Sequence, residues 1–218
     1  MDNRPNNPEY YRSKANLFFE YFLSMLEESE KVNLENYSSS ELWTEIITSS
    51  RESIIDLVFK KYSNSDDPKT NHEYFRVDNI LYSRPDELEL ESELYNVKDD
   101  TKLNRHIWDL IIAVEHENDR NDWTDEITKL MHIRSELRVV ISYSSTIDQK
   151  KEIIAATELI KHFGNYVRPE EGAFMLILGC RTDQLDSNEE IDIKEKIIKG
   201  YKAYIWNGIE LVDYKENQ

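Results

Sequence analysis

Three short apolar runs separated by helical patterns constrain the fold of this chain more than any other feature. The runs are Ile107–Glu117 (IWDLIIAVEHE), Leu137–Tyr143 (LRVVISY) and Ala173–Cys180 (AFMLILGC). Strands that are buried on both faces of a sheet have nearly continuous apolar sequences of this kind. Helical periodicity begins at Trp123 and again runs through Lys150–Phe163, between successive runs. The alternation predicts an α/β fold, with a mixed central sheet flanked by helices.

The N-terminal part is expected to contain helices and then strands. Apolar residues recur at helical spacing across residues 10–30. A second helix is expected to begin near Ser38, because Ser38 and Glu41 fit a capping box. The periodicity then changes, and Tyr74–Tyr82 and Leu88–Val97 predict two strands. Together with Ile107–Glu117, three strands would therefore precede the first crossover helix.

The C-terminal part is expected to add a helix and a hairpin to the sheet. Glu189–Lys199 has a helical pattern that stops at Gly200. Farther along, the dipeptide Asn207-Gly208 separates two strand-like segments, and this dipeptide favours a tight hairpin turn.

The domain organisation follows from the length and the absence of a linker-like segment in the sequence. A chain of 218 residues suits one domain, so residues 1–218 are interpreted as a single unit. Residues 1–36 could form an appended N-terminal helix. Residues 39–143 contain the central core, and residues 144–218 form a strand–helix–hairpin extension.

Charge and cysteine content narrow the surroundings in which this chain is expected to work. The 27 basic and 44 acidic residues give a net charge of -17, which repels phosphate at long range. The single cysteine, Cys180, allows no intramolecular disulfide and favours a reducing, cytoplasmic compartment. No apolar run approaches the ~20 residues needed to span a bilayer, so no membrane partner is expected.

Acidic residues at the end of the first apolar run indicate a metal site. Alternation along Ile107–Glu117 places Glu115 and Glu117 on one face of the strand, roughly 7 Å apart. Asp78, within the strand Tyr74–Tyr82, is the natural third carboxylate. Carboxylate oxygens are ligands that Mg²⁺ prefers, and Mn²⁺ accepts the same donors. A metal held there can activate water and stabilise charge on a phosphodiester.

The order of elements and acids resembles the core of the PD-(D/E)xK nuclease superfamily, also called the restriction-endonuclease-like fold. Asp78 matches the acidic residue of the second core strand, and Glu115-His116-Glu117 matches the (D/E)-x-K of the third. The resemblance covers roughly residues 39–143. It implies a Mg²⁺- or Mn²⁺-dependent enzyme that hydrolyses phosphodiester bonds of DNA or RNA, of a restriction or defence type.

The sequence departs from the superfamily pattern at the third motif position, where Glu117 replaces the lysine. Some superfamily members have glutamate there, and Lys129 on the next helix could supply the missing ammonium group. Asp86, in the literal Pro-Asp dipeptide, and Asp109 are alternatives to Asp78 as the motif acid. Residues 86–106 could be a core strand or an inserted hairpin.

A second hypothesis keeps the fold without catalysis. The missing motif lysine and the net charge of -17 favour an acidic interaction module that binds a basic protein partner, as an immunity or regulatory protein would. A third hypothesis is a subunit of a larger nuclease complex whose partner contacts the nucleic acid. A basic trough leading to Glu115 would favour the nuclease.

Overall fold

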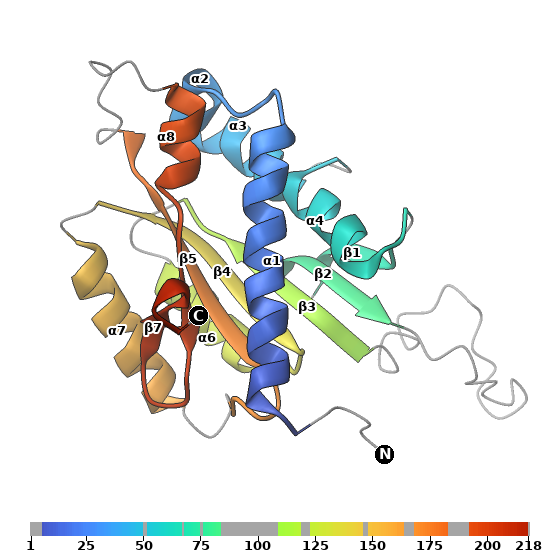
Figure 1. The fold of residues 1–218 in the computed structure, drawn as a ribbon, viewed down its shortest axis with the longest axis vertical. Helices are drawn as coiled ribbons and strands as arrows, with labels where there is room; N and C mark the ends of the chain where they lie inside the picture. The colour runs from blue at the N-terminus through green and yellow to red at the C-terminus, as the bar shows by residue number, and fades with distance from the viewer. Residues whose placement is uncertain are drawn as a thin grey trace, which may run out of the picture.

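The computed structural model describes residues 6–49, 52–66, 68–74, 76–83, 109–118, 123–145, 148–163, 168–182 and 192–217. Within these residues, seven strands form one mixed sheet in sequence order. The strands are β1 (Thr70–Tyr74), β2 (Val77–Ser83), β3 (Asp109–His116), β4 (Leu137–Ser144), β5 (Ala173–Cys180), β6 (Lys202–Trp206) and β7 (Leu211–Asp213). The expected α/β class, a mixed sheet flanked by helices, is confirmed (Figure 1).

The three apolar runs form the parallel centre of the sheet. β3 pairs with β4, and β4 pairs with β5, both in parallel. Parallel neighbours need a crossover connection, and α6 (Trp123–Met131) and α7 (Gln149–His162) supply the two crossovers. Antiparallel pairs extend the sheet on both sides, β1–β2–β3 at one edge and β5–β6–β7 at the other.

Helices cover both faces of the sheet and bury alternate strand residues. In β3, Ile112 and Val114 pack in one core cluster with α1 (Pro8–Glu28) and α4 (Ile54–Ser63). Ala113, between them, packs in a second cluster with α6 and α7. Because side chains alternate along a strand, each face of β3 contributes to a different core.

α1 contributes extensively to the first cluster. Asn7 caps its first turn, and Pro8 occupies a position where a missing N–H costs little. Figure 1 shows α1 lying across the sheet, and it contacts both α4 and β5. Its buried residues are Tyr11, Ala15, Phe18, Phe19, Phe22, Met25 and Leu26.

The single helix expected from Ser38 onward is divided into α3 (Ser40–Thr44), the π-helical segment η1 (Glu45–Ser49) and α4. A further short helix, α2 (Leu34–Ser38), precedes them. Ser39 and Ser53, in extended conformations, start new helices by accepting backbone N–H groups with their side chains. Ser39, rather than Ser38, is therefore the cap. Hydrophobic periodicity alone predicts one continuous helix here, but the serine caps end one helix and start the next.

The strand expected at Tyr74–Tyr82 is a hairpin made of β1 and β2. Tyr74 pairs with Val77, and Arg76 in the turn has a left-handed φ of 66°. The polar sequence of β1 conceals it from a search for alternating apolar residues. The expected strand Leu88–Val97 lies outside the described residues. Among the residues that the structure describes, β1, β2 and β3 precede the first crossover.

The C-terminal helix and hairpin are confirmed, with changes in their limits. α8 (Ile193–Lys199) starts after a cap by Asp192, and β6 pairs with β7. Trp206 pairs with Leu211, so four residues form the loop instead of the expected two. The Asn207 side chain accepts two backbone N–H groups of this loop, and Gly208 has a φ of 97°. A short 3-10 helix, η4 (Tyr214–Asn217), follows β7.

Candidate functional site

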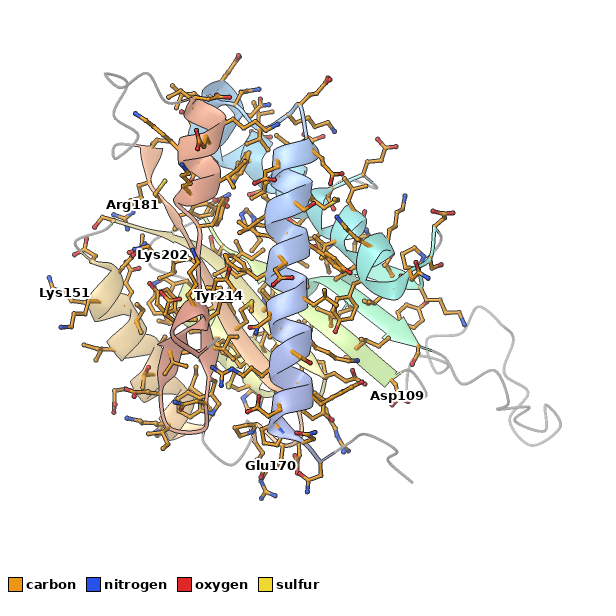
Figure 2. The ribbon with its side chains drawn as sticks, in the orientation of Figure 1. Asp109, Lys151, Glu170, Arg181, Lys202 and Tyr214 are labelled. Atoms are coloured by element: carbon orange, nitrogen blue, oxygen red, sulfur yellow. The ribbon has the colours of Figure 1, made fainter. Side chains whose placement is uncertain are left out.

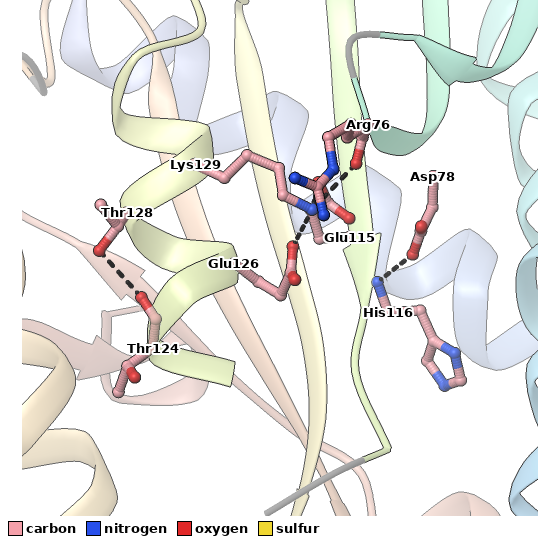
Figure 3. Close-up of polar contacts among 8 residues, drawn as sticks. All are labelled: Arg76, Asp78, Glu115, His116, Thr124, Glu126, Thr128 and Lys129. Carbon is pink, nitrogen blue, oxygen red and sulfur yellow. Dashed lines mark hydrogen bonds and ion pairs between the residues drawn. The ribbon is translucent and has the colours of Figure 1, made fainter. Parts of the chain in front are cut away.

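Asp78 and Glu115 face each other across the antiparallel pair of β2 and β3. Asn79 pairs with Val114, so continuing the register by one position places Asp78 opposite Glu115. Directly opposed side chains lie on one face of the sheet, and like charges there repel. Asp78 Oδ2 also accepts the backbone N–H of His116 at 2.8 Å. Figure 3 shows both carboxylates where β2, β3 and α6 meet.

Glu115 is buried, with 1% of its surface exposed, although it is an acidic residue that follows the apolar centre of β3. Burial and the neighbouring Asp78 raise the pKa of its carboxyl group to about 9, although Lys129 acts in the opposite direction. The Glu115 carboxyl group therefore stays protonated at neutral pH unless a cation binds beside it. A buried acid with such a shift is typical of functional sites.

Lys129 of α6 reaches this carboxyl group. Its Nζ lies 2.8 Å from Glu115 Oε1, contacts Glu126 and donates to the Arg76 carbonyl oxygen at 2.9 Å. Partial burial alone would lower the pKa of Lys129, but its hydrogen bonds to Glu115 and Glu126 raise it. The lysine is therefore a fixed cation between the carboxyl groups of Glu115 and Glu126 (Figure 3).

α6 owes its orientation to its apolar face. Trp123, Ile127 and Leu130 are buried in the second core cluster, which turns Lys129 toward the end of β3. Glu126 stands one helical turn before Lys129, at the spacing where side chains meet. Sequence reasoning missed Glu126, and only this i,i+3 spacing from Lys129 could have indicated it.

The stability of the metal-free protein is expected to fall as the pH rises from about 5 to 9. Glu115 keeps its proton in the folded state up to a pKa of about 9, but an unfolded glutamate releases it near 4.5. The folded state therefore binds more protons across this window, so rising pH favours unfolding. Each pKa unit corresponds to about 1.4 kcal/mol. The free energy of unfolding of Glu115→Gln should therefore rise by a few kcal/mol relative to that of wild type by about pH 9.

Urea unfolding with a chelator present, at a series of pH values, measures this difference directly. Glu158→Gln is the matched control, because Glu158 is exposed on α7. Parallel stability curves for wild type and Glu115→Gln across the window would contradict the raised pKa.

Glu117 lines a hollow whose lining does not include Glu115. β3 ends at His116, so strict alternation is no longer imposed on Glu117. Asn118 then donates its side-chain amide to the Ser40 carbonyl and to Thr44 Oγ1, which ties the chain to α3. The hollow, of about 730 Å³, is lined by Ser40, Glu41, Thr44, Glu45, Ser49, Glu117 and Asn118.

Asp109 does not join Asp78 and Glu115. It starts β3 opposite Ser83 (Figure 2), six residues from Glu115, which is about 20 Å along the strand. Asp86 lies outside the described residues. The structure thus brings together Asp78, Glu115 and Lys129. Within the described ranges, no group of three or more His, Cys, Asp or Glu side chains is arranged to hold a metal ion.

His116 points to the opposite face of β3, into the core beneath α3. Its Nε2 lies 2.8 Å from the Tyr143 hydroxyl, which also accepts the Trp43 indole N–H at 2.6 Å. Burial lowers the pKa of His116 to about 3, so the ring is neutral at physiological pH. The side chain is a core histidine that anchors the end of β3, as its place in the strand pattern predicts.

The paired carboxylates fit a hard divalent cation. Mg²⁺ is commonly held by one or two carboxylates, with water and substrate phosphate completing its shell. Asp78 and Glu115 supply two oxygen donors. A cation between them would offset the effect of Asp78 on Glu115 and allow Glu115 to lose its proton.

Comparison with known proteins assigns no family to this chain. The chain matches no protein-family model, and no curated protein matches it. Among the helices of the described ranges, none is long and apolar enough to cross a membrane.

Proposed function

We propose that this protein is a divalent-metal-dependent phosphodiesterase that cleaves DNA or RNA, of a restriction or defence type. One observation carries the proposal: Asp78 and Glu115 oppose each other at the ends of adjacent strands, and Lys129 contacts the buried Glu115. Burial of one carboxyl group beside a second one weakens a fold unless the pair serves another purpose.

The order of elements supports the finer assignment of a restriction-endonuclease-like core. α4, the antiparallel β1–β2–β3, the crossover α6 and the parallel β4 follow one another along the chain. This succession resembles the helix, three strands, helix and strand of the PD-(D/E)xK superfamily. Asp78 then belongs to the second strand and Glu115 to the third.

Each residue of the site has a distinct role in this proposal. Asp78 and Glu115 would hold Mg²⁺ or Mn²⁺, which supplies water activation and stabilises charge on the scissile phosphate. Lys129 orients the attacking water or offsets negative charge that develops in the transition state. Glu126 keeps the Lys129 ammonium beside the carboxylates. Of the three acids expected to bind the metal, Glu117, which lines a separate hollow, is the one that the geometry supports least.

Lys129→Met tests the proposal, because it separates metal binding from cleavage. Removal of the ammonium group leaves the two carboxylates uncompensated, so Mn²⁺ should bind about tenfold tighter. Cleavage should nevertheless fall by about 10²–10³-fold, because the charge that supports the transition state is lost. Calorimetric titration of Mn²⁺ and a cleavage assay on DNA and RNA measure the two effects.

Lys161→Met is the control, since Lys161 is exposed on α7 and pairs with Glu158. Wild-type protein that binds no Mn²⁺ and cleaves neither nucleic acid would contradict the proposal. A Lys129→Met variant that equals wild type in both assays would remove Lys129 from the site.

The competing hypothesis is a restriction-endonuclease-like protein without catalysis that binds a basic protein partner. It is favoured by the Lys129 ammonium, which already contacts both Glu115 and Glu126, and by the net charge of -17. In that case Lys129 permanently replaces the metal. Capture of a basic protein, with no Mn²⁺ binding by wild type, would favour this hypothesis. A nuclease subunit would instead cleave nucleic acid only with its partner added.

A further inference from the structure

Arg76 has an unusual backbone conformation beside the candidate site. Two described residues other than glycine have a positive φ, Asn64 and Arg76. Asn64 ends α4, and asparagine tolerates the left-handed region well there. Arginine does not share this tolerance. Strained residues of this kind persist where their surroundings hold them, and they gather at functional sites.

The surroundings that hold Arg76 are residues of the site itself. Its carbonyl oxygen accepts a hydrogen bond from Lys129 Nζ at 2.9 Å. The same ammonium group lies 2.8 Å from Glu115 Oε1. Asp78 follows Arg76 by two residues at the start of β2. The turn, the lysine and the carboxylate pair are therefore one connected unit (Figure 3).

The Arg76 side chain is exposed, and among the described residues no ion pair to its guanidinium is found. This is notable in a chain with 44 acidic residues, because Glu115 and Glu126 contact Lys129 and Asp78 lies opposite Glu115. Those carboxylates would repel a phosphodiester. A guanidinium at the rim suits a phosphate group, because its planar fork donates two hydrogen bonds to two phosphate oxygens.

We propose that Arg76 is the residue that binds the nucleic-acid phosphate next to the Asp78–Glu115 pair. This inference rests on the proposed nuclease function. The left-handed turn directs the Arg76 carbonyl to Lys129 and leaves the guanidinium on the solvent side. The arginine would thus offset, at the point of contact, the long-range repulsion of an acidic protein.

Arg76→Gly is the test variant, because glycine accepts the left-handed conformation while the guanidinium is removed. Binding of a short mixed-sequence duplex DNA and of a single-stranded RNA is measured with Ca²⁺ over a range of salt concentrations. We expect about 10–100-fold weaker binding of the preferred nucleic acid. We also expect the slope of log affinity against log salt to fall by about one unit.

Three controls distinguish a phosphate contact from a structural effect. Asn64→Gly changes the same kind of backbone position away from the site and should bind like wild type. Arg76→Lys should keep the salt slope while binding more weakly, since it keeps the charge but not the fork. Mn²⁺ affinity and thermal stability of Arg76→Gly should match or exceed those of wild type.

The outcomes separate this inference from the proposed function. Arg76→Gly with wild-type affinity and salt slope would overturn the phosphate contact alone. Weakened binding accompanied by loss of Mn²⁺ affinity or of stability would make Arg76 a structural residue and overturn it too. If wild-type protein binds neither nucleic acid at any salt concentration, the proposed nuclease function fails with it.

Discussion

Glu115→Gln is expected to lower nucleic-acid cleavage by about 10³-fold, which corresponds to ~4 kcal/mol of transition-state stabilisation. Glutamine keeps the shape of the side chain but cannot carry the negative charge that holds the cation. The same change should abolish saturable Mn²⁺ binding in a calorimetric titration. In wild type the cation must displace a proton from Glu115, so Mn²⁺ affinity should increase with pH below about 9.

A comparison with Glu117→Gln decides which glutamates form the site. Glu117 follows Glu115 by two residues but lines the hollow beside α3. If Asp78 and Glu115 alone hold the cation, Glu117→Gln should change the Mn²⁺ affinity little. Equal losses in the two variants would restore the three-carboxylate set expected from the sequence. Full cleavage by Glu115→Gln would contradict the proposed mechanism, and Glu158→Gln controls for a general loss of negative charge.

Phe22→Ala is expected to lower the free energy of unfolding by about 3–5 kcal/mol. Phe22 of α1 is fully buried, and its ring meets that of Tyr201 edge to face, with centroids 5.2 Å apart. Truncation leaves a cavity between the helix and the sheet. For a chain of this length the melting temperature should fall by roughly 10 °C, measured by calorimetry or circular dichroism.

The same measurement tests how residues 1–36 relate to the rest of the chain. Leu17→Ala is the matched control on α1, because Leu17 is 36% exposed and should change stability by less than about 0.5 kcal/mol. One cooperative transition that shifts in Phe22→Ala indicates a single folding unit. An unchanged main transition, with a separate small one for the helix, would indicate an appendage.

Much of the sheet could be predicted because its centre has strong local signals. β5 coincides with the expected Ala173–Cys180, since eight consecutive buried residues need no neighbour to identify them. β3 and β4 begin or end within a residue or two of expectation. In contrast, β1 is polar and escaped notice, because its pairing with β2 depends on a turn in which Arg76 adopts a left-handed conformation.

The candidate site was only partly predictable for a related reason. Asp78 and Glu115 are neighbours by the register of two strands, and alternation plus strand order could suggest that pairing. Alternation also suggested Glu117, but the amide of Asn118 ties the chain to α3 after β3 has ended. Glu126 and the turn at Arg76 enter the site through Lys129, a contact between elements that are distant in sequence.

The amino-acid sequence by itself determined the α/β class, the buried central strands and the acids that could serve a metal site. These features depend on hydrophobic periodicity and side-chain alternation, which are local properties of the chain. Only the tertiary structure decided which acids meet. The packing of Trp123, Ile127 and Leu130 turns Lys129 toward Glu115, and the burial that follows raises the pKa of that carboxyl group. Proximity and desolvation arise when separate elements pack together, so no local pattern specifies them.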